Sequence, residues 1–431
     1  MLASNQQLMA RRKRVLGPAY SHFYRQPLQL VRGEGVWLYD ESGKRYLDCY
    51  NNVPSVGHCH PEVVNALTRQ ASTLNTHTRY LHPEVIEYAE ELAATLPGDL
   101  SVCTFVCTGT EANDLAYRIA ATVTGNTGAI VTSQAYHGNS WLVSQLSPES
   151  VAVEDRADFI VEVEPPYTYR GPFGEDHPDV SGAYAGLVDT AVEQLQERGK
   201  APAMMMVDGI YDARGILTPE PAYLQQVYAK VRAAGGLMVA DEVQSGLTRL
   251  GDNFWGFMDS GVIPDIVTMG KPMGDGHPLA VVVTTPAIAE AFAAQSEYFN
   301  TYGGNPVSAA VGRAVLNIVQ RDDLITNVKA SGEHLLAGLR KLQQSHECFG
   351  EVRGKGLFIG VELVGDRATR EPAPKRAAAL IEAMRERGVL ASTIGAHGNV
   401  LKLRPPLTFE PQHAEQALAV IEESLQVTAH E

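Results

Sequence analysis

MVADEVQSG at residues 238–246 and IVTMGKP at residues 266–272 are two short apolar runs, and each ends in polar residues and a glycine. Runs of this kind, bounded by Gly and Pro, predict buried strands that deliver Asp241 and Lys271 to loops at their ends. A lysine directly after a buried strand loses water, which lowers its pKa and makes the neutral amine available as a Schiff-base nucleophile. We therefore expect Lys271 to be the central catalytic residue.

Asp241 suits a second role at the same edge of the predicted sheet. The ring nitrogen of pyridoxal phosphate needs a buried carboxylate, which keeps the nitrogen protonated so that the ring can absorb the electrons of a substrate carbanion. An aspartate at the end of a strand can supply that carboxylate. Together, Asp241 and Lys271 point to chemistry that depends on pyridoxal phosphate.

The composition bounds the class of protein. With 431 residues, 45% hydrophobic and 20% charged, the chain is long enough for one large core and a smaller one. A formal net charge of −15 argues against nonspecific binding to nucleic acid or to an anionic membrane, and no run approaches the roughly 18 apolar residues of a membrane span. The 5 cysteines form no CxxC pair and no apolar export signal is evident, so we expect reduced thiols in the cytoplasm.

The pattern along the chain predicts an α/β protein with three parts. Residues 1–60 form an N-terminal segment with a β-meander, residues 61–315 a large domain, and residues 316–431 a smaller C-terminal α/β domain. In the large domain helical patterns alternate with short apolar runs, which predicts a mostly parallel central sheet with helices on both faces. The predicted strands of this sheet are residues 103–107, 129–132, 203–207, 237–240, 266–268 and 279–284.

Two further stretches could bind a cofactor. Thr108-Gly109-Thr110 follows a predicted strand and opens a helix, where free backbone N–H groups and the helix dipole favour a phosphate, although many ordinary N-caps look the same. Tyr136-His137-Gly138 places an aromatic ring near the same sheet edge, where it could stack on a planar cofactor or simply be a core tyrosine in a turn. Gln244 lies three residues after Asp241 and could reach the cofactor's phenolic oxygen.

Taken together, the strings resemble the class III aminotransferases among the fold type I pyridoxal-phosphate enzymes, over nearly the whole chain. The strings that carry the resemblance are, in order, TGTEAN (108–113), YHG (136–138), DEVQSG (241–246), VTMGKP (267–272) and NTYGGNP (300–306). The resemblance implies the fold type I architecture, pyridoxal phosphate as cofactor, and a homodimer or homotetramer. For the cofactor it implies a Schiff base at Lys271, pairing of the ring nitrogen with Asp241, and ring stacking by Tyr136. It implies phosphate contacts by Gly109 and Thr110, and a contact from Thr301 to the cofactor phosphate of the opposite subunit. Gln244 would donate a hydrogen bond, and His137 and Val243 would make further cofactor contacts.

Fold and cofactor leave the reaction open, because the substrate pocket decides it. Typical members carry a Glu-Pro-x-x-x-Glu-Gly segment whose second glutamate pairs with and releases an arginine, so that the pocket can alternate between two substrates. The matching segment here, VDGIYDARG at residues 207–215, has Ala213 at that gating position. Lys402 occupies the position of the carboxylate-binding arginine, and Lys402 and Arg404 should point to the same face of a strand.

Within the class the chain is most similar to the ethanolamine-phosphate phospho-lyases and their 5-phosphohydroxylysine relatives. The shared-looking strings include LNT (74–76), TYRG (168–171), GKPMG (270–274) and YFNTYGGNPVS (298–308), whereas residues 208–215 depart from both subgroups. This resemblance implies a small phosphorylated amine as substrate and a phospho-lyase reaction that yields an aldehyde, ammonia and phosphate. A lyase handles one amine and never admits a keto acid, so it does not need the missing gate.

The departing phosphate dianion needs cations. Arginine suits it best because a guanidinium can form two parallel hydrogen bonds to phosphate oxygens. The candidates are Arg79, Lys402 and Arg404, with His77 or Tyr24 as further possibilities, although Arg79 and Arg404 could instead hold carboxylates at a surface or interface. We expect no metal site: His58 and His60 flank Cys59 before a proline, a spacing that better predicts the entry to a helix.

Two other functions stay open. One is a class III ω-aminotransferase that transfers an amino group to pyruvate or 2-oxoglutarate. The other is a cofactor-sensing module fused to a regulator, which is disfavoured because no DNA-binding extension is evident in the sequence. The sequence does not specify the chain length of the substrate.

Overall fold

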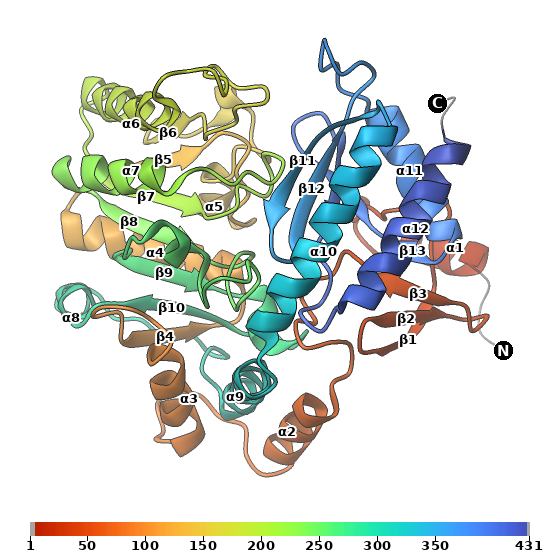
Figure 1. The fold of residues 1–431 in the computed structure, drawn as a ribbon. Coiled ribbons are helices and arrows are strands. Elements are labelled where there is room, and N and C mark those ends of the chain that lie inside the picture. The colour runs from red at the N-terminus through yellow and green to blue at the C-terminus, as the bar shows by residue number, and fades with distance from the viewer. Residues whose placement is uncertain (1–4, 429–431) are drawn as a thin grey trace.

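The computed structural model describes residues 5–428, and its centre is a seven-stranded sheet with the order β4-β10-β9-β8-β7-β5-β6 (Figure 1). Only β10 runs antiparallel to its neighbours, which confirms the predicted, mostly parallel sheet. The strands are β4 (Val102–Val106), β5 (Gly128–Thr132), β6 (Ile160–Val163), β7 (Pro202–Asp208), β8 (Leu237–Asp241), β9 (Ile266–Met269) and β10 (Ala280–Thr284).

Helices cover both faces of this sheet, as the near-continuous apolar strands require. Alternate residues of β7 face opposite sides: Met204 and Met206 join the core beneath α4 (Gly109–Thr124), while Met205 joins the core beneath α6 (Val180–Glu197) and α7 (Pro221–Ala233). Every residue of β7 is buried. The sheet is therefore a rigid platform from which the strand ends project.

Shorter helices complete the large part of the molecule. Next to the β4 edge in Figure 1 lie α2, α3 and α9, and α9 packs on both α2 and α3. These helices are α2 (Pro61–Ala71), α3 (Pro83–Ala93), α5 (Trp141–Gln145), α8 (Pro286–Ala293) and α9 (Pro306–Arg321).

The C-terminal part contains a second sheet, with the order β11-β12-β15-β14, and its paired strands are antiparallel. Helices pack around it on the right of Figure 1, which confirms the predicted smaller α/β unit. Its elements are α10 (Leu324–Ser345), β11 (Phe349–Lys355), β12 (Phe358–Leu363), α11 (Pro374–Glu386), β14 (Ser392–Ile394), β15 (Val400–Leu403) and α12 (Pro411–Val427).

The N-terminal meander belongs to the same part of the molecule as this C-terminal unit. Its strands are β1 (Leu30–Glu34), β2 (Trp37–Asp40) and β3 (Arg45–Asp48), and β3 pairs in parallel with β13 (Val389–Leu390). The segment 1–60 therefore shares a sheet with residues 389–390 of the C-terminal unit, a long-range pairing that no local pattern predicts.

A buried carboxylate on β12 ties the two parts together. Glu362 accepts hydrogen bonds from Tyr167 Oη at 2.5 Å and Arg170 Nε at 2.7 Å, in the loop after β6, and from Arg353 Nη2 at 2.8 Å on β11. Asn399 Nδ2 donates a further bond at 3.0 Å. These partners outweigh the cost of burial and hold the pKa of Glu362 at about 2.

The helix α1 (Asn5–Val15) carries the basic run 11–14, and no residue of this helix is buried. Within residues 5–428, no helix has both the length and the apolar character needed to cross a lipid bilayer.

Candidate active site

The carboxyl ends of the parallel strands meet at one edge of the large sheet, and the predicted site residues lie there. In register, Asp208 at the end of β7 is beside Asp241 at the end of β8, which in turn is beside Thr268 on β9. Ligands of open α/β sheets bind in the crevice outside these strand ends. The fold therefore places an acid-rich edge where a ligand should bind.

A pocket opens at this edge and collects most of the predicted cofactor residues. Its lining residues are Thr108, Gly109, Thr110, Tyr136, His137, Gly138, Asp208, Asp241, Val243, Gln244 and Lys271. Every cofactor residue predicted from the sequence is in this set except Thr301. Thr301 lies on an exposed loop instead.

Lys271 is the first residue of a 3₁₀ turn (Lys271–Gly274) directly after β9. Its φ of +25° is positive, a strained conformation for a non-glycine residue that persists only where the surrounding structure enforces it. Burial and the nearby Arg404 lower the pKa of its ammonium, and the carboxylates of Asp241, Asp212 and Asp208 oppose that shift. Within residues 5–428 no hydrogen bond or ion pair occupies the Lys271 amine, so it is available to react.

Asp241 is held rigidly from two sides. Its Oδ2 accepts hydrogen bonds from Asn113 Nδ2 at 2.9 Å and from His137 Nδ1 at 2.7 Å, and its Oδ1 accepts one from the backbone N–H of Val243 at 3.0 Å. His137 is buried, and its Nε2 has no hydrogen-bond partner among the described residues. The carboxylate therefore has a fixed orientation, and a buried polar atom beside it is left for a ligand.

The N-terminus of α4 forms the opposite wall of the pocket. Thr108 is the N-cap, and its side chain accepts a bond from the backbone N–H of Glu111. Gly138 approaches this turn so closely, at a φ of +144°, that a Cβ there would lie 2.5 Å from Thr110 Oγ1. The Thr110 hydroxyl also donates to Asn139 Oδ1 at 3.1 Å. The result is a glycine-lined cradle at a helix N-terminus, which suits a phosphate.

Gln244 links the pocket to a buried charge network that the sequence did not predict. Its Nε2 donates to Asp212 Oδ2 at 2.6 Å, and its Oε1 accepts a bond from Arg404. Lys402 Nζ lies 2.6 Å from Asp212 Oδ1, and Arg404 Nη1 lies 4.0 Å from Asp212 Oδ2. Lys402 and Arg404 thus converge on one carboxylate, as expected for two residues on the same face.

Asp208 and Asp212 are two buried acids at this edge that sequence reasoning did not single out. Asp208 is buried, and burial with its acidic neighbours raises its pKa to about 6. The available signal was the same one that identified Asp241, an aspartate at the end of an apolar strand. Asp212 gave no comparable signal because it lies in the loop after β7, four residues beyond Asp208.

The other expected phosphate ligands lie away from this pocket. Arg79 is exposed and its guanidinium lies 4.0 Å from the ring centroid of Phe299, while the imidazole of His77 stacks on Tyr80. Tyr24 is buried, and its hydroxyl donates to the carbonyl of Ala391 at 2.9 Å and accepts from its N–H at 3.2 Å. The structure therefore gives Tyr24 a packing role in the C-terminal unit and does not bring it to Lys271.

The histidines on either side of Cys59 make local contacts in the fold. His60 is the N-cap of α2 and its Nδ1 accepts a bond from the N–H of Glu62, while His58 Nε2 lies 2.7 Å from Asp48 Oδ2. His60 thus stands at a helix entry, as predicted.

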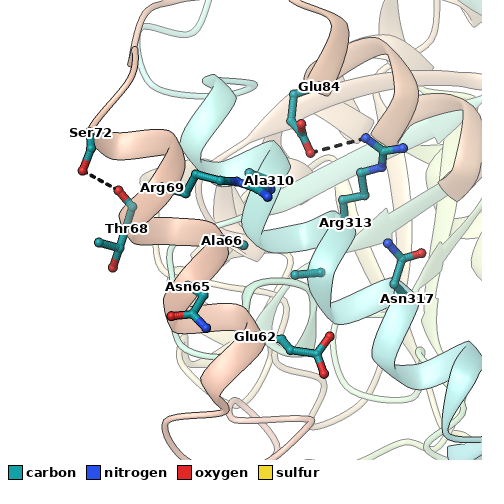
Figure 2. Close-up of a pocket in the computed structure, with 11 residues that line it drawn as sticks. Glu62, Asn65, Ala66, Thr68, Arg69, Ser72, Glu84, Ala310, Arg313 and Asn317 are labelled. Atoms are coloured by element: carbon teal, nitrogen blue, oxygen red, sulfur yellow. Dashed lines mark hydrogen bonds and ion pairs between the residues drawn. The ribbon is translucent and has the colours of Figure 1, made fainter.

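A second pocket lies between α2, α3 and α9 and shares no lining residue with the first (Figure 2). Figure 2 shows Glu84 directed at Arg313, 3.6 Å away. Arg313 also pairs with Glu87 and Glu91, so its charge is already neutralised. We assign no chemistry to this pocket.

The residues around Lys271 fit pyridoxal phosphate. An unpaired lysine can take the aldehyde, a fixed buried carboxylate can meet the ring nitrogen, and the helix N-terminus can take the phosphate. Tyr136 supplies an aromatic wall.

Comparisons with known proteins agree with this fit. The family model "Aminotransferase class-III" matches residues 19–425. The chain is 42% identical to "Alanine--glyoxylate aminotransferase 2-like" of Drosophila melanogaster, covering 97% of this chain and 87% of that protein. It is 37% identical to "Ethanolamine-phosphate phospho-lyase homolog 1" of Caenorhabditis elegans, covering 98% and 94%. A solved phospholyase from Arthrobacter, in complex with phosphoethanolamine, is 43% identical with a TM-score of 0.93, covering 97% of this chain and 99% of that one.

Proposed function

The chain belongs to the class III aminotransferase family, whose cofactor is pyridoxal phosphate, and from that premise we propose that it is a phospho-lyase. Its substrate is an amino-alcohol phosphate such as ethanolamine phosphate. The net reaction consumes one water and gives an aldehyde, ammonia and phosphate; from ethanolamine phosphate the aldehyde is acetaldehyde. Similarity to a phospholyase solved with phosphoethanolamine supports this substrate class.

Lys271 is the base of the proposed reaction. When bound, pyridoxal phosphate supplies an aldehyde for the substrate amine and a ring that accepts an electron pair from Cα. Burial lowers the pKa of Lys271, so a larger fraction of its side chain is the neutral amine that can remove a proton from Cα. The proton goes to Nζ, and the C–O bond at Cβ then breaks with its electrons leaving on phosphate.

Asp241 supplies the fixed negative charge of the site. Because Asn113, His137 and the N–H of Val243 hold both of its oxygens, the carboxylate needs no reorganisation during the reaction. It would keep a proton on the ring nitrogen throughout.

One observation carries the choice of lyase over aminotransferase. The position of the gating glutamate is occupied by Ala213, whose buried methyl group cannot pair with or release a cation. The next residue, Arg214, is already bound to Glu164, with Nε 2.8 Å from Oε1. A site without this switch suits an enzyme that handles one amine.

We place the cations for the phosphate partly on a second subunit. Arg79 contacts Phe299, two residues before Thr301, the residue expected to reach the opposite subunit. Around them are large exposed apolar side chains, those of Tyr80, Leu81, Phe299 and Tyr302. A patch of this kind suits burial against a second copy of the chain. We therefore propose a homodimer in which Arg79 and Thr301 serve the site of the partner.

Hybrid dimers test the shared site. A Lys271→Ala subunit mixed with an Arg79→Leu subunit can form one site that has both Lys271 and Arg79, so activity should rise above that of either parent. No gain on mixing, with dimers verified by light scattering, would contradict the arrangement.

The reaction itself is tested with ethanolamine phosphate and no oxo acid. We expect phosphate and ammonia to appear in equal amounts. The second candidate, an ω-aminotransferase using pyruvate or 2-oxoglutarate, is favoured by the relative named for alanine–glyoxylate transfer. Product formation that requires pyruvate or 2-oxoglutarate would establish that candidate instead.

We also propose a cytoplasmic location. All 5 cysteines are free thiols, as is usual in a reducing compartment. Cell fractionation with an antibody to the protein tests this location.

A further inference from the structure

The loop between β7 and α7 presents Asp212 in a strained and well-supported conformation. Tyr211 has a φ of +49° and Ile216 a φ of +66°, and both side chains are buried. A β-branched residue in the left-handed region is an outlier that persists only where packing enforces it. The backbone N–H of Asp212 also donates to Asp208 Oδ2 at 2.9 Å. The loop is therefore built to hold this carboxylate in one place.

The carboxylate of Asp212 is buried and paired with cations, and both of its hydrogen bonds, from Gln244 and Lys402, go to Oδ2. It is 4% exposed, with Lys402 Nζ at 2.6 Å from Oδ1 and Gln244 Nε2 at 2.6 Å from Oδ2. Arg404 Nη1 stands 4.0 Å away. Electrostatic interaction with Lys402 and Arg404 lowers the pKa of Asp212, so it is ionised at neutral pH.

We propose that Asp212 is an internal substitute for a substrate carboxylate and that it selects amines that carry no carboxylate. This inference rests on the proposed function and names the residue that restricts its substrate class. Lys402 and Arg404 lie directly behind Gln244, which lines the pocket of Lys271, and Asp212 already pairs with both cations. The short aspartate side chain, on a loop fixed at both ends, cannot swing away as a longer gating side chain could.

As a consequence, the charge of Asp212 should exclude substrates that carry a carboxylate. An α-amino acid or an oxo acid would bring a second carboxylate to cations that are already paired, where like charges repel in a buried site. An amino-alcohol phosphate has no carboxylate on the carbon that bears its amine, so Asp212 does not oppose it.

The test compares the binding of L-alanine to the holoenzyme and to two variants. Asp212→Asn keeps the shape of the side chain and removes its charge, while Asp212→Ala also opens space. We expect the dissociation constant for L-alanine, from titration of the visible spectrum, to fall about tenfold or more in each. The titrations are run below pH 7, because burial already lowers the pKa of Lys402 to about 8 and loss of Asp212 lowers it further.

The double variant Asp212→Asn/Lys402→Met is the control, and it should lose most of the gain because Lys402, the cation in direct contact with Asp212, is gone while only the more distant Arg404 remains. A second readout is independent of catalysis: formate should raise the melting temperature of Asp212→Ala by replacing the missing carboxylate, whereas chloride at equal concentration should not. If Asp212→Ala fails to fold, Asp212→Asn decides alone. An unchanged affinity for L-alanine in every folded single variant overturns the inference.

The outcome is separable from that of the proposed function. Release of phosphate from ethanolamine phosphate by the wild-type enzyme tests the lyase, whereas the affinity for L-alanine tests Asp212. If the variants bind L-alanine more tightly but the wild type releases no phosphate, the lyase is refuted and the exclusion of carboxylates by Asp212 stands.

Discussion

Glu362, which joins the loop after β6 to the C-terminal unit, should make stability depend on pH in a defined way. Its carboxylate is 1% exposed and its pKa is lowered from 4.5 to about 2 by Arg353, Tyr167, Arg170 and Asn399 against the cost of burial. Since one pKa unit corresponds to about 1.4 kcal/mol, this difference stabilises the fold by about 3 kcal/mol. Because the pKa of the folded state is the lower one, that stability is present above pH 4.5 and is lost as pH falls toward 2.

The perturbation is Glu362→Gln, measured as the melting temperature of the holoenzyme at several pH values. At about 2 cal/mol/K of unfolding entropy per residue, a loss of about 3 kcal/mol in a chain of this length lowers the melting temperature by about 3 °C at pH 7. The difference from wild type should shrink to about two thirds of that near pH 3.5, where Glu362 is mostly protonated in the unfolded chain but still ionised in the folded one.

Glu351→Gln is the matched control, because Glu351 also pairs with Arg353, at 2.5 Å, yet burial raises its pKa. Ionisation of Glu351 therefore adds no stability at neutral pH, and this variant should not show the same loss. A destabilisation of Glu362→Gln that is the same at every pH, or that Glu351→Gln reproduces, would refute the reasoning.

Three further predictions concern single residues. Asp241→Asn should lower kcat for phosphate release about a hundredfold or more, since it removes the preorganised charge of the site while the cofactor absorbance remains; an unchanged kcat would exclude the role. Arg79→Leu should raise the KM for ethanolamine phosphate about tenfold because a guanidinium contact to phosphate is lost, and a KM equal to that of wild type would remove Arg79 from the site. His60→Ala should lower the free energy of unfolding by up to about 1 kcal/mol through loss of the α2 cap, and equal urea denaturation midpoints would contradict this.

Much of the fold was predictable because periodicity is a local signal. The two-face burial of β7 to β9 follows from their continuous apolar runs, which stand out from the helical patterns on either side. Two of the strands that were not predicted show the physical reasons: β6 has four residues at the sheet edge, and β11 is interrupted by Gly350 and Gly354 and carries the buried Arg353.

The site was predictable to the extent that its residues stand at strand ends. Lys271 and Asp241 line the same pocket as Gly109 and Tyr136, because the parallel strands that precede these residues end at one edge of the sheet. The role of Asp212 depends instead on long-range packing, since its partner Lys402 is 190 residues away. The contact between Tyr24 and Ala391 has the same character, because the two residues lie 367 positions apart in sequence.

The most direct test of the account is the covalent attachment of the cofactor to Lys271. The holoenzyme is treated with borohydride, digested and analysed by mass spectrometry, with the visible spectrum recorded before reduction. We predict a yellow protein and a pyridoxyl group on the Nζ of Lys271. A colourless holoenzyme, or a pyridoxyl group on any other lysine with Lys271 unmodified, would contradict the central claim.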